Sequence, residues 1–274
     1  MFTKLLKHDL KANAGLLGLL GGCALGVGCL AAVVLRLLTT HWEQITAKDE
    51  LMLILIPAIL FLFFAYLAII LYGVCTQYIL LFRFYKSRFT DEGYLMFTLP
   101  VKTSHIFLSG ALNILIWSLI AVVVIIASLA IAVGIGPAWT EEVLEEIRWA
   151  FGDMRFFFSE VTTHGYGIGM VLNVLIMGLY SIIAPMSAVV LGATIAKKHK
   201  VLAIIGIMIG ISMVTSTING IITSVMQLLL MSAQGNVESI TTLTPLVSSI
   251  VPLLLAVGGY FLSIHLMKKK LNLP

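Results

Sequence analysis

The chain has 274 residues, of which 60% are hydrophobic and only 11% are charged, and its mean hydropathy is +1.07. A water-soluble core of this length cannot bury so much apolar surface, so the composition excludes an ordinary soluble domain and predicts a lipid environment. The formal net charge is only +4, and we expect no nucleic-acid partner.

Six apolar runs are long enough to cross a bilayer, because about 20 helical residues cover a hydrocarbon core roughly 30 Å thick. A membrane β-barrel would show short segments of alternating polarity, whereas Ile114 to Leu129 is apolar on every face. We therefore predict an all-α integral membrane protein, with one transmembrane domain over residues 1–274. Its predicted spans are residues 14–38, 51–82, 106–135, 167–196, 201–231 and 245–267.

The basic residues are distributed unevenly over the segments between these spans. The two ends of the chain and the loops after the second and fourth spans hold 13 of the 17 Lys and Arg residues, but three of the 13 acidic residues. Since Lys and Arg in short loops stay in the cytoplasm, both termini are expected on the cytoplasmic side of the cell membrane.

Residues 1–12 precede the first span and have an amphipathic pattern. Phe2, Leu5, Leu6 and Leu10 recur at helical spacing, with lysines mostly opposite. This predicts a short helix at the cytoplasmic membrane surface. The alternative is an unstructured basic leader that serves only to orient the chain.

The cytoplasmic loop at residues 83–105 has a helix-sized pattern of its own. Thr90 is a suitable N-cap, and Pro100 ends the helix before Thr103 or Ser104 caps the next span. The helix would carry an apolar cluster that must lie in the interface or be covered by a partner. It consists of Tyr94, Leu95, Met96 and Phe97, close to the charged side chains of Arg88, Asp91 and Glu92.

Two other segments depart from a simple bundle. The outer loop at residues 137–166 has four glutamates interleaved with apolar residues, which predicts an amphipathic helix on the outer surface. The fifth run is longer than a bilayer needs and contains Asn219-Gly220 near its middle. We expect a break there and re-entrant outer material over residues 220–252.

Small and polar residues also occur inside the spans. Gly18, Gly22 and Gly26 repeat every four residues, which lets helices approach closely, either within the chain or in a dimer. The uncharged polar side chains are expected mostly to hydrogen-bond between helices. The subset that could line a substrate path is Gln77, Asn113, Asn173, Thr215 and Asn219.

Several chemistries are not expected. The dipeptide Gly-Lys is missing from the sequence, so no P-loop can form and the chain does not hydrolyse ATP by itself. No His or Cys pair has metal-ligand spacing, and we predict no metal site and no catalytic residue. No charged residue lies deep in a predicted span, which argues against an ion-coupled carrier.

The order of these parts resembles a permease of the ATP-binding-cassette type-2 exporter class over essentially the whole chain. The string from Asp91 to Pro100, DEGYLMFTLP, is similar to one found in small bacterial permeases of that class, at the place of its coupling helix. The outer loop at 137–166 is longer than the minimal plan of the class.

The resemblance implies a half-transporter that pairs with itself or with a second permease and binds two separate ATPase subunits. ATP and Mg²⁺ would then be held by the partner ATPase, and none by this chain. Tyr94 to Phe97 would fill a groove on the ATPase, and Arg88, Asp91 and Glu92 would set its orientation. The apolar spans favour a peptide, an antimicrobial or a lipid-like molecule as the substrate.

Two rival functions stay open at this point. One is a non-transporting membrane protein, such as a scaffold, an immunity protein or a sensor subunit. The other is an intramembrane enzyme, for which the spans contain no nucleophile, base or metal constellation. A neighbouring ATPase gene would favour export, and a neighbouring kinase gene would favour sensing.

Overall fold

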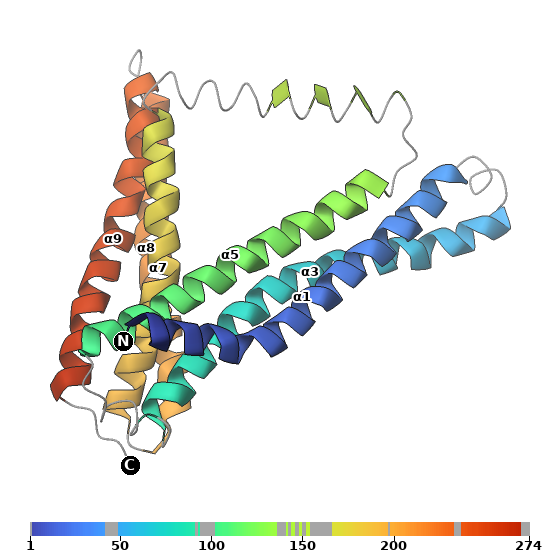
Figure 1. Ribbon diagram of the computed structural model, residues 1–274. Helices are drawn as coiled ribbons and strands as arrows, with labels where there is room; N and C mark the ends of the chain where they lie inside the picture. Colours follow the sequence, from blue (N-terminus) through green and yellow to red (C-terminus); the bar gives the residue numbers. More distant parts are fainter. Residues whose placement is uncertain are drawn as a thin grey trace. The chain divides into compact units, whose positions relative to one another are not determined.

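A computed structural model describes most of the chain as long helices. No β-strand occurs among the described residues, which are 2–41, 49–90, 93, 102–135, 141, 144–145, 148–149, 152–153, 166–196, 198–232 and 237–269. The helices, drawn in Figure 1, are α1 (Phe2–Thr40), α3 (Asp49–Phe89), α5 (Thr103–Ile135), α7 (Tyr166–Ile195), α8 (Lys200–Ser232) and α9 (Val237–Lys269).

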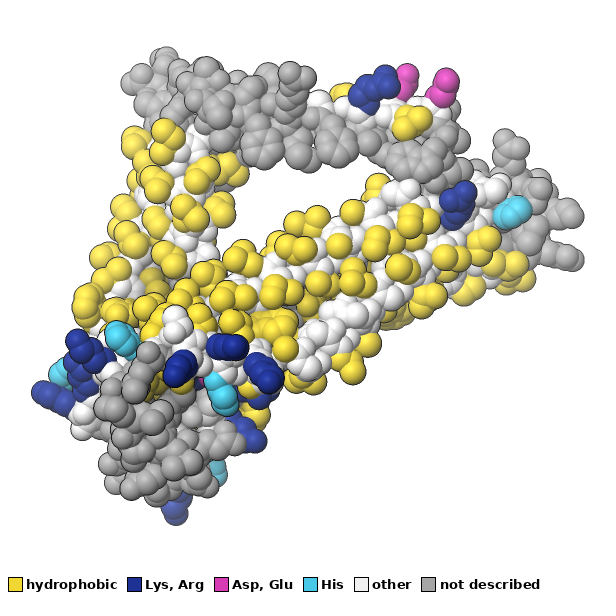
Figure 2. Space-filling model, in the orientation of Figure 1, with side chains coloured by type: hydrophobic (Ala, Val, Ile, Leu, Met, Phe, Trp, Pro, Cys, Tyr) yellow, Lys and Arg dark blue, Asp and Glu magenta, His cyan; other side chains and the backbone are white. Residues whose placement is uncertain are grey.

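All six helices are long and apolar enough to cross a membrane. Each predicted span coincides with one of them, so this part of the fold prediction is confirmed. Figure 2 shows apolar side chains along the lengths of the helices and Lys, Arg and His side chains at their ends. The large hydrophobic side chains that are exposed, such as Leu53 and Val123, would lie against lipid.

The chain divides into two compact units, and the division passes through α3 and α5. The first unit contains Met1–Leu80 and Leu112–Ala150, and therefore α1, most of α3 and most of α5. The second contains Leu81–Ala111 and Phe151–Pro274, and therefore the end of α3, the start of α5 and helices α7 to α9.

In the first unit, α1 buries one narrow stripe against α3 and α5. The buried positions Leu17, Gly21, Ala24 and Gly28 recur every three or four residues, as on the seam of a coiled coil. A Cβ atom on Gly21 would lie 3.2 Å from the Tyr72 hydroxyl oxygen. One on Gly28 would lie 3.0 Å from the Ser128 carbonyl oxygen and side chain, so only glycine fits there without a shift.

The glycine repeat predicted to mediate close packing lies on a different face of α1. Gly18, Gly22 and Gly26 are exposed, and a Cβ atom on any of them would meet no described atom of another element within 4 Å. The prediction that these glycines pack within the chain is therefore wrong. The contact is made instead by Gly21 and Gly28, because the seven-residue spacing holds them on the buried stripe.

In the second unit, α7 is the central helix and packs on both α9 and α8, which also contact each other. Its C-terminal half is the most deeply buried part, with Met186, Ala188 and Val190 fully enclosed. At the end of α7, Gly192 lies against α8, where an added Cβ would fall 2.7 Å from the backbone nitrogen of Ile204. This close approach fixes the tight connection between the two helices.

Two predicted interruptions do not occur. Residues 2–12 are not a separate interface helix, because α1 is one helix of 39 residues, although its first turns run in a different direction from the rest (Figure 1). Helix α8 likewise continues through Asn219-Gly220. A broken backbone would leave unpaired amides in an apolar medium, which costs more than the roughly 1 kcal/mol for a helical glycine.

The expected capping residues near the cytoplasmic loop also differ. Thr90 follows the end of α3, and its hydroxyl donates to the Lys86 carbonyl at 2.5 Å, so it closes the helix before it. The first amides of α5 donate to the Lys102 carbonyl, at 2.9 Å from His105. Thr103 therefore lies inside α5, and its hydroxyl has no hydrogen-bond partner among the described residues.

We predict that Gly28→Leu separates α1 from α5 and lowers stability by about 1–3 kcal/mol, because an added side chain overlaps Ser128. Thermal unfolding of the detergent-purified protein measures the effect. Gly22→Leu is the matched control on the open face of the same helix and should be close to neutral. Equal losses in the two variants would show that the contact at Gly28 does not hold these helices together.

Candidate functional site

The predicted coupling segment follows directly after α3. Asp91, Glu92 and the cluster from Tyr94 to Phe97 lie outside the described residues. Arg88 in the last turn of α3 and Gly93 within the predicted segment are described. These two residues show how the helix ends where the segment begins.

Arg88 is buried, with 2% of its surface exposed. Its Nη2 donates to the Ser109 hydroxyl at 3.2 Å, and its Nη1 donates to the Ser87 hydroxyl at 2.8 Å. The guanidinium carbon lies 4.8 Å from the centre of the Phe84 ring, which adds a cation–π contact. Arg88 thus joins the end of α3 to the start of α5.

Aromatic rings surround this guanidinium. Phe84 makes edge-to-face contacts with Phe89 and Phe107, with ring centres 6.1 and 6.2 Å apart. Phe107 in turn meets Tyr260 of α9 at 5.7 Å. Gly110 lies so close to Phe84 that an added Cβ would approach its ring to 2.7 Å. We name the set Arg88, Phe84, Phe107, Ser109 and Gly110 the arginine joint.

The joint changes the interpretation of Arg88. A guanidinium that is 2% exposed presents little surface to a partner, whereas its Nη2 bond to Ser109 links α3 to α5 of the same chain. Burial of a charge is costly unless it is well hydrogen-bonded, so the joint has a defined geometry. A direct part for Arg88 in orienting an ATPase stays a prediction, and its position gives it an internal role as well.

Gly93 lies where only glycine fits. Its amide donates to the Thr90 carbonyl at 2.8 Å. A Cβ atom there would fall 2.5 Å from the Arg88 carbonyl oxygen, well inside van der Waals contact. Gly93 therefore lies tightly against the end of α3, next to the arginine joint.

Positive charge is concentrated beside this helix end. Tyr85 of α3 and the connection between α7 and α8 line a shallow hollow of about 330 Å³. The residues Lys198, His199 and Lys200 of that connection line the hollow, and the first two are exposed. The hollow is therefore lined by basic side chains.

Two of the predicted path residues lie in the first unit. Gln77 of α3 donates from Nε2 to the Ser118 hydroxyl of α5 at 2.6 Å, so it bridges two helices. Asn113 is 7% exposed, and its amide oxygen has no hydrogen-bond partner among the described residues. Asn13 of α1 has a similarly buried and unpartnered amide oxygen. Gln77 is thus engaged in packing, whereas the two asparagines retain an acceptor.

The other three residues predicted to line a substrate path lie in the second unit. Asn173 of α7 donates to the Pro245 carbonyl at 2.8 Å and to the Ser248 hydroxyl at 3.0 Å, which ties α7 to α9. The Thr215 hydroxyl of α8 lies 2.8 Å from that of Tyr180 on α7. Asn219 is one turn beyond Thr215, and within the described part of the chain its amide oxygen has no partner.

That any of the five residues lines a substrate path stays a prediction. Gln77, Asn173 and Thr215 act as interhelical hydrogen-bonding residues, as the sequence analysis expected for most polar side chains. The analysis missed their partners Tyr180 and Ser248. Tyr180 could have been found from its seven-residue spacing to Asn173, which puts both on the same face of α7.

Metal-ligand groups and cysteine pairs were the remaining candidates for a site among the described residues. No group of three or more His, Cys, Asp or Glu side chains in these ranges could hold a metal ion. Cys23, Cys29 and Cys75 are free and exposed.

No protein-family model, curated protein or solved structure matches the chain. The class rests on the fold itself, in which six helices are long and apolar enough to span a membrane. The chain is an α-helical protein of the multi-pass membrane class.

We predict that Arg88→Ala lowers stability by about 1.5–3 kcal/mol, because the substitution removes charge-assisted bonds inside a buried site. Arg88→Lys should recover little, since an ammonium lacks the planar fork that reaches Ser87 and Ser109 together. Lys86→Ala, at an exposed position two residues earlier, should change stability by less than about 0.5 kcal/mol. Thermal unfolding compares the three, and an unchanged Arg88→Ala protein would contradict a structural joint.

Proposed function

We propose that the chain is the transmembrane permease subunit of an ATP-driven ATP-binding-cassette exporter. It would form half of the translocation path, pair with a second permease and bind separate cytoplasmic ATPase subunits. ATP and Mg²⁺ belong to the ATPases in this proposal, and the chain supplies the moving spans. The membrane is the cell membrane, with both termini in the cytoplasm.

The observation that carries the proposal is the arginine joint at the end of α3. Helix α3 has 41 residues, about 62 Å, which is roughly twice the thickness of a hydrocarbon core. It therefore extends beyond the hydrocarbon core. It ends at Phe89, shortly before the segment from Asp91 to Pro100, which resembles the coupling helix of the class.

The joint gives such a segment a mechanical connection to two spans. A displacement at residues 91–100 would act on α3 through the tight fold at Gly93, and on α5 through Arg88 and Ser109. Two spans would then move together when the ATPases close on ATP. A membrane scaffold would not need its cytoplasmic loop to be connected to two spans in this way.

The basic side chains near the end of α3 would suit contact with a soluble partner. The hollow lined by Tyr85, Lys198, His199 and Lys200 lies beside the end of α3. Basic residues at the cytoplasmic face would steer an acidic ATPase surface toward the coupling segment, and the attraction would weaken with salt. The spans contain no charged side chain at mid-depth, so an amphipathic peptide, antimicrobial or lipid-like molecule is the best-suited substrate.

We predict that Tyr94→Ala combined with Phe97→Ala releases the ATPase without preventing membrane insertion. Affinity purification of the solubilised protein from its native membrane, followed by mass spectrometry, measures the ratio of ATPase to permease. The parent protein should retain a P-loop ATPase at near-stoichiometric level, and the double variant should retain less than about a tenth of it, because aromatic anchors dominate interface energies.

The matched control replaces one Phe and one Tyr in the middle of α3. Phe64→Ala with Tyr66→Ala removes exposed rings that a soluble protein cannot reach, so the ATPase should remain bound. Retention of the ATPase by the Tyr94 and Phe97 variant would refute the coupling site. Recovery of no ATPase with the parent protein would favour the scaffold, immunity or sensor alternative.

A further inference from the structure

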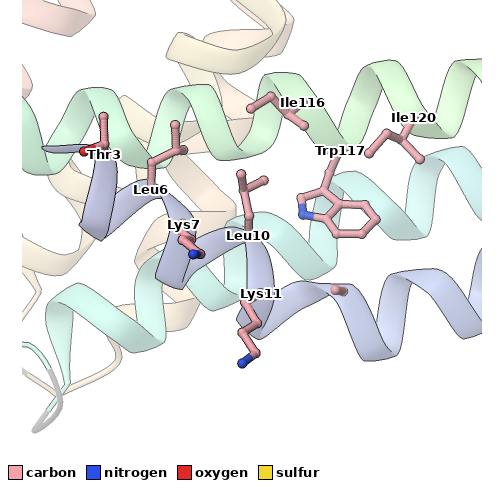
Figure 3. A pocket seen from close by; sticks show the side chains of 9 residues that line it. Thr3, Leu6, Lys7, Leu10, Lys11, Ile116, Trp117 and Ile120 are labelled. Carbon is pink, nitrogen blue, oxygen red and sulfur yellow. The ribbon is translucent and has the colours of Figure 1, made fainter.

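An apolar pocket lies between the start of α1 and the middle of α5 in the first unit, with a volume of about 570 Å³. That volume is within the range of small-molecule sites, about 300–1,000 Å³. In Figure 3, Leu6 and Leu10 of α1 point toward α5, and Trp117 and Ile120 extend from α5 into the same space. The body of the pocket is therefore a hydrocarbon surface.

The α1 side of the pocket is cationic. Lys7 and Lys11 line it, and no carboxylate does. The acidic residue of this part of α1 is Asp9, which is buried at 9% exposure and is not part of the lining. Lys11 extends away from the hydrocarbon space in Figure 3, as a lysine does when its ammonium reaches toward water.

The depth of the pocket fits the membrane interface. Helix α5 has 33 residues, about 50 Å, so part of it must lie outside a core roughly 30 Å thick. Its most apolar stretch runs from Ile114 to Ile135, interrupted only by isolated serines. Trp117 lies near the cytoplasmic start of that stretch, which is where tryptophan is enriched in membrane proteins.

Trp117 also has an unused donor. Its indole nitrogen is buried and has no hydrogen-bond partner within the described ranges. A small rotation of the ring would direct this N–H into the pocket that the ring lines. An occupant with an oxygen acceptor next to its apolar part could then accept the bond.

From these features we propose that the pocket binds one anionic phospholipid of the cytoplasmic leaflet. An acyl chain lies against Leu6, Leu10 and Ile120, an ester oxygen accepts from Trp117, and Lys7 and Lys11 hold the phosphate headgroup. Charge complementarity selects an anionic lipid over a zwitterionic one, and the long apolar body selects a lipid over free phosphate. The site does not depend on the transport function proposed above.

The test uses the full-length chain with Trp42→Phe, Trp139→Phe and Trp149→Phe, so that Trp117 is the only tryptophan. The protein is reconstituted into phosphatidylcholine vesicles that contain increasing fractions of phosphatidylglycerol, with bromine on the acyl chains of one lipid or the other. Bromine quenches the fluorescence of a tryptophan in contact with it. No ATPase is present, so failure of the exporter proposal would not affect the result.

We expect brominated phosphatidylglycerol to quench Trp117 with at least a fivefold preference over brominated phosphatidylcholine, since each lysine near an anionic surface contributes about a fivefold factor. Lys7→Gln with Lys11→Gln should reduce the preference to about one. Lys7→Arg with Lys11→Arg should keep it, which separates loss of charge from misfolding. Lys4→Gln is the matched control, because Lys4 is exposed and outside the pocket lining.

Three results would overturn the proposal. Equal quenching by the two lipids would mean that the pocket is in contact with bulk bilayer and has no preference for an anionic lipid. No quenching by either lipid would mean that protein, such as a second copy of the chain, covers Trp117. Reversal of the quenching by millimolar inorganic phosphate would mean that the lysines bind a free anion.

Discussion

The fold depends on the requirement that every backbone amide and carbonyl in a bilayer be hydrogen-bonded within the protein. This keeps α8 continuous across Asn219-Gly220 and α7 continuous across Pro185. Hydroxyl groups in the spans obey the same rule, since Thr76 donates to Tyr72 and Thr215 donates to Ile211 one turn earlier. Broken helices therefore do not supply binding groups in the described spans, and function must come from side chains and helix ends.

Lipid is as apolar as the helix surfaces, so contact between helices needs close packing and polar bonds rather than hydrophobic exclusion. The structure uses both. Gly28 and Gly192 bring backbones together at α1–α5 and α7–α8. Gln77 and Asn173 add hydrogen bonds at α3–α5 and α7–α9, each worth only about 0.6 kcal/mol on average in such settings. Close packing and polar bonds thus occur in both units of the chain.

The sequence predicted the six spans well because hydropathy over 20 residues reports directly on lipid compatibility. It did not predict which glycines make contact, since Gly18, Gly22 and Gly26 form as regular a repeat as the buried stripe containing Gly21 and Gly28. The choice between two faces of one helix depends on its neighbours, which sequence spacing does not contain. The break expected at Gly220 does not occur. The low helix propensity of glycine predicted it, but the apolar residues on both sides favour a continuous helix.

The burial of Arg88 could not be predicted from the sequence either. Its partner Ser109 is 21 residues away in the chain, and hydropathy places Arg88 and Ser109 at the edge of the membrane. In the structure, Arg88 bonds Ser109 of α5, and Gly110 of α5 lies against Phe84 of α3. Trp117 lies eight residues beyond Ser109 on the same helix, about 12 Å away.

A lipid bound between α1 and α5 at Trp117 would contact α5, the helix that Arg88 bonds at Ser109. If both proposals hold, the anionic lipid content of the cytoplasmic leaflet would alter how readily α5 follows α3. The coupling would then be set by two polar contacts on α5, one to Arg88 and one to a phospholipid. Both lie near the cytoplasmic end of a helix whose remaining length is apolar.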